Sequence, residues 1–217
     1  MKILVTGGAG YIGSATAAYL LEAGHEVVVY DSLENGHRAA IPAQAAFVQG
    51  DVRDRAALAA AFEQHHPDAV AHFAAYIEAG ISMKRPGLYF DNNVGGAMTL
   101  LEAMAEQGVR RLVFSSTAGV YASSDAPLVE GHPYAPANVY AETKLMIERM
   151  IRWYHEIHGL RYCVLRYFNA CGAMLDGAGR ALRGEAHQPE SHLIPLVLQV
   201  ALGQRESIAV FGTDYPT

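Results

Sequence analysis

A glycine-rich stretch near the N-terminus restricts the fold more than any other feature of this sequence. Gly7, Gly10 and Gly13 follow one another at the G-x-x-G-x-x-G spacing, directly after the apolar run at residues 2–6. Glycines at this spacing allow a tight turn, let the backbone approach a pyrophosphate, and point the N-terminus of the next helix at its negative charge. An ordinary tight turn is the alternative interpretation. The position of the motif between a strand and a helix favours a dinucleotide site.

Apolar runs and amphipathic stretches alternate along most of the chain. After residues 2–6, strands are predicted near residues 26–31, 45–49, 69–74, 111–116 and 161–168. The first helix is indicated by the helical spacing of Ile12, Thr16, Tyr19, Leu20 and Ala23, with Gly24 as its cap. Later helices are predicted from Asp54, over about 88–107, and over 138–158. Six or more strands alternating with helices predict an α/β fold, a doubly wound parallel Rossmann sheet.

The pattern changes near residue 170, which predicts two domains. Residues 1–170 are expected to form the nucleotide-binding domain, and residues 171–217 the beginning of a smaller substrate lobe. Within this lobe, a helix near 192–202 and a short strand at 207–211 are predicted. The chain ends in turn-forming residues without a closing element, so we expect an incomplete lobe.

A carboxylate ends the second predicted strand and bears on the choice of nucleotide. Asp31 stands where it can accept hydrogen bonds from an adenosine ribose, and it would repel the 2′-phosphate of NADP. NAD is therefore the expected cofactor. Arg38 lies in the following loop, so NADP stays open as the weaker alternative.

Tyr140 and Lys144 are four residues apart on a predicted helix, which places both side chains on one face. A nearby ammonium favours a phenolate, so we expect Lys144 to lower the pKa of Tyr140 from about 10 toward neutrality. Ser115 and Thr117 end the preceding strand, at the sheet edge where such folds bind ligands. Together these residues predict proton-transfer chemistry, although a tyrosine and a lysine at this spacing also occur on ordinary helices.

Composition excludes several other classes of protein. The net charge is -6 without a basic run, which argues against nucleic-acid binding. No apolar run is long enough to span a membrane. Two cysteines, Cys163 and Cys171, lack the spacing of metal ligands, and the ten histidines show no i, i+4 pairing. We therefore expect a cytoplasmic protein without a metal site.

The motifs together resemble those of UDP-glucose 4-epimerases, which belong to the extended short-chain dehydrogenase/reductase family. The resemblance covers the whole chain. The stretches that carry it are Val5-Thr6-Gly7-Gly8, Gly50-Asp51-Val52-Arg53, His72-Phe73-Ala74-Ala75, Asp91-Asn92-Asn93-Val94, Phe114-Ser115-Ser116-Thr117, Leu165-Arg166-Tyr167-Phe168-Asn169, His192-Leu193-Ile194-Pro195 and Phe211-Gly212-Thr213-Asp214-Tyr215-Pro216-Thr217.

The resemblance implies a role for each matching residue. Tyr140 would be the base, Thr117 would hold the sugar 4-hydroxyl, and Lys144 would contact the nicotinamide ribose. The implied cofactor set is Gly7, Gly10, Tyr11, Ile12, Gly13, Asp31, Asn35, Asp51, Val52, Phe73, Ala74, Ala75, Asn92, Ser115, Tyr140, Lys144 and Phe168. The implied substrate set is Thr117, Tyr140, Asn169, His192, Leu193 and Phe211. The reaction would pass through a transient 4-keto sugar, and a homodimer would form through the helices at 88–107 and 138–158.

Two departures and two alternatives accompany this resemblance. Ile77 and Ile81 replace polar residues that are usual in the family. A related nucleotide-sugar dehydratase, decarboxylase or reductase would share the same fold and the same tyrosine and lysine, but dehydratases carry two acids where this chain has Ala118 and Gly119. A non-catalytic NAD-binding fragment is the other alternative, and the intact Thr117 speaks against it.

Overall fold

A computed structural model describes residues 1–187, 190–210 and 212–214, and divides the chain into two compact units at Ala170 and Cys171. In the first unit the strands are β1 (Lys2–Thr6), β2 (Glu26–Asp31), β3 (Ala46–Gln49), β4 (Ala69–His72), β5 (Arg111–Thr117) and β6 (Arg161–Tyr167). Its helices are α1 (Tyr11–Glu22), α2 (Arg55–His65), α3 (Ala79–Ser82), α4 (Pro86–Tyr89), α5 (Gly96–Glu106) and α6 (Val139–His158). Shorter helical turns are η1 (Arg38–Ala40), η2 (Phe90–Gly95) and η3 (Ala118–Val120).

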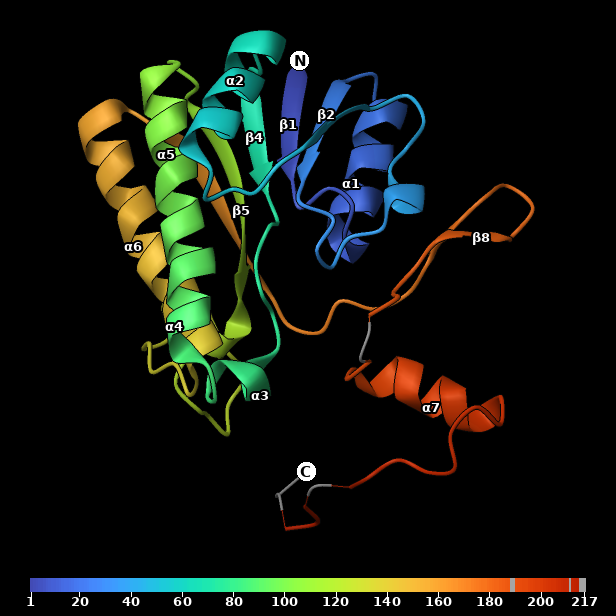
Figure 1. The fold of residues 1–217 in the computed structure, drawn as a ribbon. Helices are drawn as coiled ribbons and strands as arrows, with labels where there is room; N and C mark the ends of the chain where they lie inside the picture. The colour runs from blue at the N-terminus through green and yellow to red at the C-terminus, as the bar shows by residue number, and fades with distance from the viewer. Residues whose placement is uncertain (188–189, 211, 215–217) are drawn as a thin grey trace. The chain divides into compact units, whose positions relative to one another are not determined.

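The six strands form one parallel sheet in the order β3-β2-β1-β4-β5-β6, seen in Figure 1. The chain starts in the middle, winds outward to β3, then crosses back and winds outward to β6. This is the doubly wound order, whose reversal between β1 and β4 opens a crevice at the carboxyl ends of the strands. The expected Rossmann sheet is confirmed.

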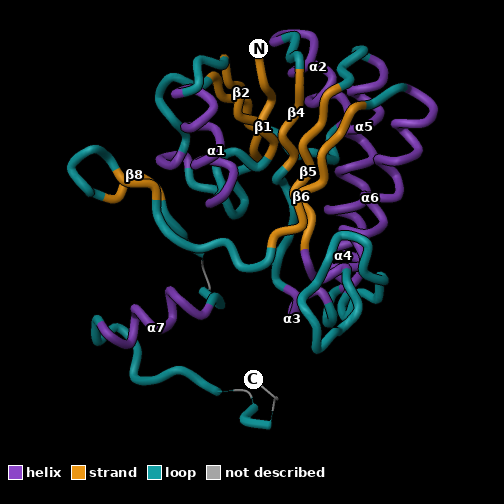
Figure 2. The backbone as a smooth tube through the Cα atoms, turned by 180° about the vertical axis from the view of Figure 1, so that it is seen from behind, coloured by secondary structure: helices purple, strands orange, loops and turns teal. Residues whose placement is uncertain are grey.

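Helices cover the two faces of the sheet unequally. α2, α5 and α6 pack on one face over the larger core, which includes Leu4, Phe62, Leu100, Phe114 and Ile147. α1 covers part of the other face, over a smaller core (Figures 1 and 2). The apolar spacing that predicts α1 does not identify the buried side of this helix. The buried residues of α1 are Gly13, Ser14, Ala17 and Ala18. Tyr19, which belongs to the predicted apolar side, is 59% exposed. Small side chains bring this helix close to the strands.

The helix expected over about 88–107 is interrupted. α4 and α5 are joined by η2, a π-helical turn in which the backbone makes i→i+5 hydrogen bonds. This wider turn carries two buried asparagines, Asn92 and Asn93. π-Turns inside α-helices are frequent at functional sites, and both asparagines belong to the site described below.

The second unit contains β7 (Met174–Leu175), β8 (Ala181–Arg183) and α7 (Leu193–Ala201). β7 and β8 form an antiparallel pair. The predicted helix is confirmed, whereas the strand predicted at 207–211 is wrong over 207–210, where the chain forms no strand, and Phe211 lies outside the described residues. Within the described part of the chain, no helix is long and apolar enough to cross a membrane.

Candidate active site

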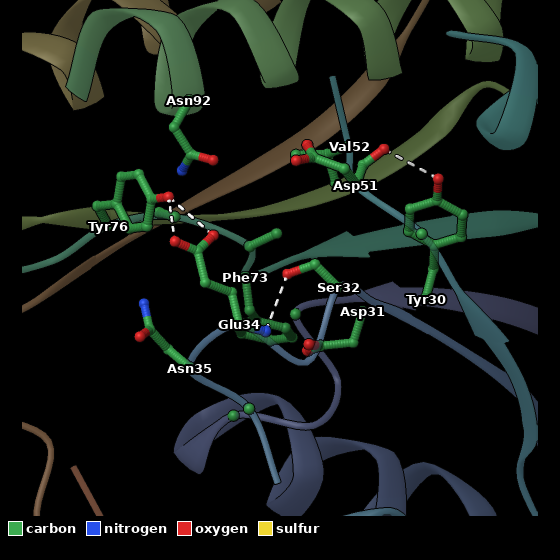
Figure 3. A pocket seen from close by; sticks show the side chains of 16 residues that line it. Tyr30, Asp31, Ser32, Glu34, Asn35, Asp51, Val52, Phe73, Tyr76 and Asn92 are labelled. Atoms are coloured by element: carbon green, nitrogen blue, oxygen red, sulfur yellow. Dashed lines mark hydrogen bonds between the residues drawn. The ribbon is translucent and has the colours of Figure 1, made fainter. Parts of the chain in front are cut away.

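A pocket opens at the carboxyl ends of β1 to β4, where the crevice of this strand order is expected (Figure 3). Ten of the residues expected to bind the cofactor line it: Gly7, Gly10, Asp31, Asn35, Asp51, Val52, Phe73, Ala74, Ala75 and Asn92. Six more lining residues escaped the sequence analysis: Tyr30, Ser32, Glu34, Gly36, Gly50 and Tyr76. Each of these six is the direct sequence neighbour of an expected residue, so adjacency to the predicted residues was the signal available.

The glycine loop leaves no room for a side chain. Gly7 has φ +70°, and a Cβ there would come within 2.5 Å of the Ala74 backbone nitrogen. A Cβ on Gly13 would lie 2.1 Å from the Gly7 carbonyl oxygen. The loop can therefore run directly beneath the pocket, with the first turn of α1, including Tyr11 and Ile12, behind it. An N-terminal helix turn in this position favours an anionic ligand.

Asp31 is held rigidly at the end of β2. Its carboxylate accepts the backbone N–H of Ala9 at 2.9 Å and that of Leu33 at 2.8 Å, and the side chain lines the pocket. Arg38, the residue that kept NADP open, instead stacks its guanidinium on the Phe47 ring at 3.9 Å and does not line the pocket. The pocket therefore presents a fixed negative charge where NADP would need a positive one.

Ion pairs of Arg53 and hydrogen bonds of Asn93 hold the other segments that line the pocket. Arg53 bridges Asp51 after β3 and Asp91 in η2, at 2.6 and 2.7 Å, and its hydrogen bond to Asp51 lowers the pKa of that carboxyl group. Asn93 accepts the backbone N–H of Tyr76 at 2.9 Å and donates to the Tyr76 carbonyl oxygen and the Thr143 hydroxyl, both at 3.1 Å. The π-turn thus joins the pocket wall to α6.

Tyr140, Lys144 and Thr117 lie beside this pocket, at the carboxyl end of β5 and the start of α6. Asn138 caps the helix by accepting the Ala141 N–H at 2.9 Å. The Lys144 ammonium is buried and donates to the Ser115 carbonyl oxygen at 2.8 Å. Its nitrogen lies 5.8 Å from the centre of the Tyr140 ring. The three predicted groups and Ser115 are therefore brought together.

The electrostatics of this group differ from the sequence-based expectation. Burial raises the pKa of Tyr140, and only the hydrogen bond with Thr117 opposes that rise. Burial also lowers the pKa of Lys144 to about 7, so this group carries only part of its charge at neutral pH. The expected lowering of the tyrosine pKa by the ammonium is therefore wrong for this structure, because desolvation by burial dominates the pKa of Tyr140.

A charged network supports the loop between β5 and α6. Arg166 on β6 donates to Glu148 on α6 at 2.7 and 3.1 Å and to the hydroxyls of Tyr121 and Tyr134 at 2.6 and 2.8 Å. Its guanidinium also lies over both tyrosine rings, at 4.9 and 4.8 Å. Ser116 adds a hydrogen bond to Glu148 at 2.5 Å. The loop that begins at Thr117 is thus anchored from β6, which the sequence analysis did not anticipate.

Replacing Arg166 with lysine is expected to lower the free energy of unfolding by about 2–3 kcal/mol, because an ammonium cannot reproduce the planar fork or the stacking on two rings. Since the loop would loosen next to Thr117, kcat of the reaction proposed below should also fall about tenfold while the affinity for NAD stays unchanged. Urea unfolding, steady-state kinetics and a cofactor titration check this. Arg152→Lys, on the exposed side of α6, is the control, and a parallel loss of NAD affinity would contradict a positioning role.

The remaining expected residues lie outside the pocket lining. Phe168 and Asn169 follow β6 and are exposed, Phe168 by 69%. His192 and Leu193 belong to the second unit, at the start of α7. Ile77 and Ile81, the two departures, are 36% and 41% exposed.

Comparison with known proteins gives one consistent result. Residues 3–216 match the NAD dependent epimerase/dehydratase family. A UDP-glucose 4-epimerase from Halalkalibacterium halodurans is 53% identical over all of this chain and 64% of its own length. A solved structure of a UDP-glucose 4-epimerase has a TM-score of 0.94 at 50% identity, and that of the Brucella ovis enzyme in complex with NAD has 0.94 at 44%. This chain covers 65% of each of these two structures. The chain therefore belongs to the NAD dependent epimerase/dehydratase family.

Proposed function

We propose that this protein is an NAD-dependent UDP-glucose 4-epimerase that interconverts UDP-glucose and UDP-galactose through a transient 4-keto sugar. The observation that carries the proposal is the meeting of Thr117, Tyr140 and Lys144 beside the pocket at the carboxyl edge of the sheet. The similar proteins and solved structures that are UDP-glucose 4-epimerases support the same activity. The chain spans about 64% of the first relative.

The pocket fits NAD. The glycine turn is packed so closely against the chain's own backbone that Gly7 and Gly13 admit no side chain, which lets the backbone line the pocket where a pyrophosphate would bind. Asp31 offers a carboxylate to the adenosine ribose. Asp51 and Val52 would flank the adenine, and Phe73, Ala74 and Ala75 the ribose and pyrophosphate. Asn35 and Asn92 would also contact the cofactor. Bound NAD would supply reversible hydride transfer to the sugar.

The protein's own residues would handle the proton. Tyr140 would take the proton of the sugar 4-hydroxyl and return it, while Thr117 holds that oxygen by a hydrogen bond. Lys144 would contact the nicotinamide ribose and, when protonated, stabilise the phenolate. Ser115 would orient Lys144 through its carbonyl oxygen. Lys144 is buried, whereas Tyr140 and Thr117 are half-buried, so these two hydroxyls can reach a substrate while the ammonium stays out of water.

The sugar nucleotide would extend from this site toward the end of β6. We assign Phe168 to the nicotinamide and Asn169, His192, Leu193 and Phe211 to the UDP group, as the family resemblance implies. The neighbouring structure from Stenotrophomonas maltophila, described with bound NAD and a formylated UDP-arabinopyranose, supports a UDP-sugar as the ligand class. A dehydratase is disfavoured, since Ala118 and Gly119 give η3 no acid for expelling a hydroxyl.

Incubation of the purified chain with UDP-galactose, without added NAD, tests the proposal. The expected result is UDP-glucose, detected by chromatography, together with NAD released when the protein is denatured. Product without exogenous cofactor would show that NAD stays bound through turnover. Retained NAD without product would make this chain a cofactor-binding fragment, and neither NAD nor product would refute the proposal.

Asp31→Asn is expected to weaken NAD binding at least tenfold. It should also reduce the ratio of the affinity for NAD to the affinity for NADP. The amide loses the negative charge that accepts ribose hydroxyls, and its NH₂ group faces a backbone N–H that now lacks an acceptor. Fluorescence titration of the cofactor-free protein with each nucleotide measures both effects. Asp125→Asn, in the exposed loop after β5, is the matched control. An unchanged NAD affinity would remove Asp31 from the site.

We further propose a cytoplasmic homodimer formed through α4–α5 and α6. Three large apolar side chains on these helices are well exposed: Met98, Trp153 and Ile157, at 53%, 59% and 68%. Exposed apolar groups of this size favour burial against a partner. Both cysteines are free, which fits a reducing compartment. Sedimentation equilibrium over a range of concentrations tests the dimer.

A further inference from the structure

The second unit contains a compact group of histidines and carboxylates that the proposed reaction does not use. Glu185, His187, Glu190 and His192 lie between β8 and α7. Each offers one ligand atom, and these atoms all lie within 4.8 Å of one another. All four belong to the same unit, so the cluster is defined by local chain geometry.

The distances within this cluster bracket the spacing of ligands around one metal ion, and the two shortest are hydrogen-bond lengths, one of them the hydrogen bond between His192 Nδ1 and Glu190 Oε1. His192 Nδ1 lies 2.8 Å from Glu185 Oε1 and 2.9 Å from Glu190 Oε1. His187 Nδ1 lies 3.3 Å from Glu185 Oε1 and 3.8 Å from Glu190 Oε2. A tetrahedral zinc ion with bonds of about 2.0–2.1 Å to nitrogen and oxygen places its ligand atoms about 3.4 Å apart. The observed separations lie on both sides of this value.

One nitrogen of the cluster is buried without a hydrogen bond. His187 Nδ1 is inaccessible to solvent, and although two carboxylate oxygens are near, none accepts a hydrogen bond from it. The side chains of Glu185 and Glu190 are themselves only 10% and 8% exposed. A simple ion-pair cluster would use this nitrogen as a donor, whereas a metal site would use its lone pair. Buried polar atoms without partners call for such an explanation.

We propose that Glu185, His187, Glu190 and His192 bind one divalent transition-metal ion, with zinc as the preferred ion. Two imidazole nitrogens and two carboxylate oxygens form a donor set that suits zinc. Two glutamates balance the charge of the ion, so the site is neutral at the N-terminus of α7, where a net positive charge would be unfavourable. Four protein ligands leave no open position, so the ion is structural.

The surroundings orient the ligands. Glu190 Oε1 accepts the backbone N–H groups of Ser191 and His192, both at 2.8 Å, which fixes the carboxylate. His192 is the residue that precedes α7, and its side chain makes no capping bond to the helix. The ion therefore ties the segment after β8 to the start of α7. With the His192 ring bound to the metal, only Leu193 and the His192 backbone remain to contact the UDP group.

This proposal revises the sequence-based expectation that the histidines form no metal site. The expectation rested on the lack of i, i+4 pairs, which is a rule for ligands on a helix. Here the ligands follow one another as E-x-H-x-x-E-x-H ahead of α7. Side chains outside a helix can converge without helical spacing, so the lack of i, i+4 pairs does not exclude this site.

Titration of the untagged chain with Co²⁺, followed by visible absorption, tests the site. The expected result is one equivalent of Co²⁺ with the strong absorption of a tetrahedral complex, displaced by one equivalent of Zn²⁺. His187→Gln and Glu190→Gln should each weaken zinc binding at least a hundredfold. His158→Gln and Glu206→Gln are the matched controls outside the cluster and should leave it unchanged.

Three results would overturn the proposal: no metal uptake by the unmodified chain, equal affinity in His187→Gln, or a thiolate-to-cobalt absorption band that places the ion on a cysteine. Where a variant fails to fold by circular dichroism, zinc X-ray absorption of the unmodified chain decides, since the site requires two imidazoles and no sulfur. Every readout is metal binding, so the result is independent of epimerase activity.

Discussion

Tyr140→Phe is expected to lower kcat for the epimerisation of UDP-galactose by about a thousandfold. The substitution removes only the hydroxyl, and with it the group that takes and returns the substrate proton, a contribution of roughly 10²–10⁴ in rate. The ring and its packing at the start of α6 remain, because the Tyr140 backbone N–H keeps its 3.1 Å hydrogen bond to Ser82 Oγ. Steady-state kinetics, with NAD content measured after denaturation, check the prediction.

Tyr19→Phe provides the matched control, since the Tyr19 side chain is 59% exposed on α1. The loss should appear in kcat, with bound NAD unchanged. A variant that keeps more than a tenth of the normal kcat would show that another group accepts the proton. If NAD is lost together with activity, the tyrosine acts in cofactor binding rather than in proton transfer.

Lys144→Met is expected to stabilise the NAD-free protein while abolishing its activity. A pKa of about 7, lowered from 10.5 by burial, means that holding the ammonium at this position costs on the order of 5 kcal/mol at pH 6. Methionine fills a similar volume without that cost. It forfeits the hydrogen bond to the Ser115 carbonyl oxygen, which is worth about 1 kcal/mol. The variant should therefore gain a few kcal/mol of unfolding free energy at pH 6.

The sign of the pH dependence makes this prediction specific. The folded-state pKa lies below the unfolded-state pKa, so the cost is fully present below about pH 7 and disappears by about pH 10.5. The cost falls from about 5 kcal/mol at pH 6 to about 2 kcal/mol at pH 9. With about 1 kcal/mol subtracted for the lost hydrogen bond, the advantage of the methionine variant should fall by roughly three quarters. Urea unfolding of both proteins at the two pH values measures it, with Lys84→Met as the exposed control. An advantage that does not change with pH would mean that packing, and not desolvation, is responsible.

Sequence reasoning predicted the sheet well because the information is local. Buried parallel strands are continuous apolar runs, and β2, with Val27, Val28 and Val29 all buried, is an example. The capping glycines Gly24, Gly108 and Gly159 mark helix ends because each adopts a positive φ. The glycine loop and Asp31 could be predicted because this information is also local: the glycines directly follow the first strand, and Asp31 ends the second.

The features that sequence reasoning missed depend on contacts between distant residues. Arg166 acts through Glu148, Tyr121 and Tyr134, which are 18 to 45 residues away, and nothing in its local pattern indicates these partners. The pKa values of Tyr140 and Lys144 depend on burial, which a spacing rule cannot supply. The buried side of α1 was missed because small residues, rather than large apolar ones, pack against the strands.

The π-turn η2 separates the packing of its helices from the placement of its asparagines. Its hydrogen bonds run i→i+5, so the turn holds one more residue than an α-helical turn does. Deleting one residue within Phe90–Gly95 would therefore restore regular winding, with the buried Tyr89 of α4 and Leu100 of α5 still on their present faces. The wide turn itself would be lost, and with it the hydrogen bonds that join Asn93 to Tyr76 and Thr143. A shortened chain should thus keep its fold and lose the wall of its pocket.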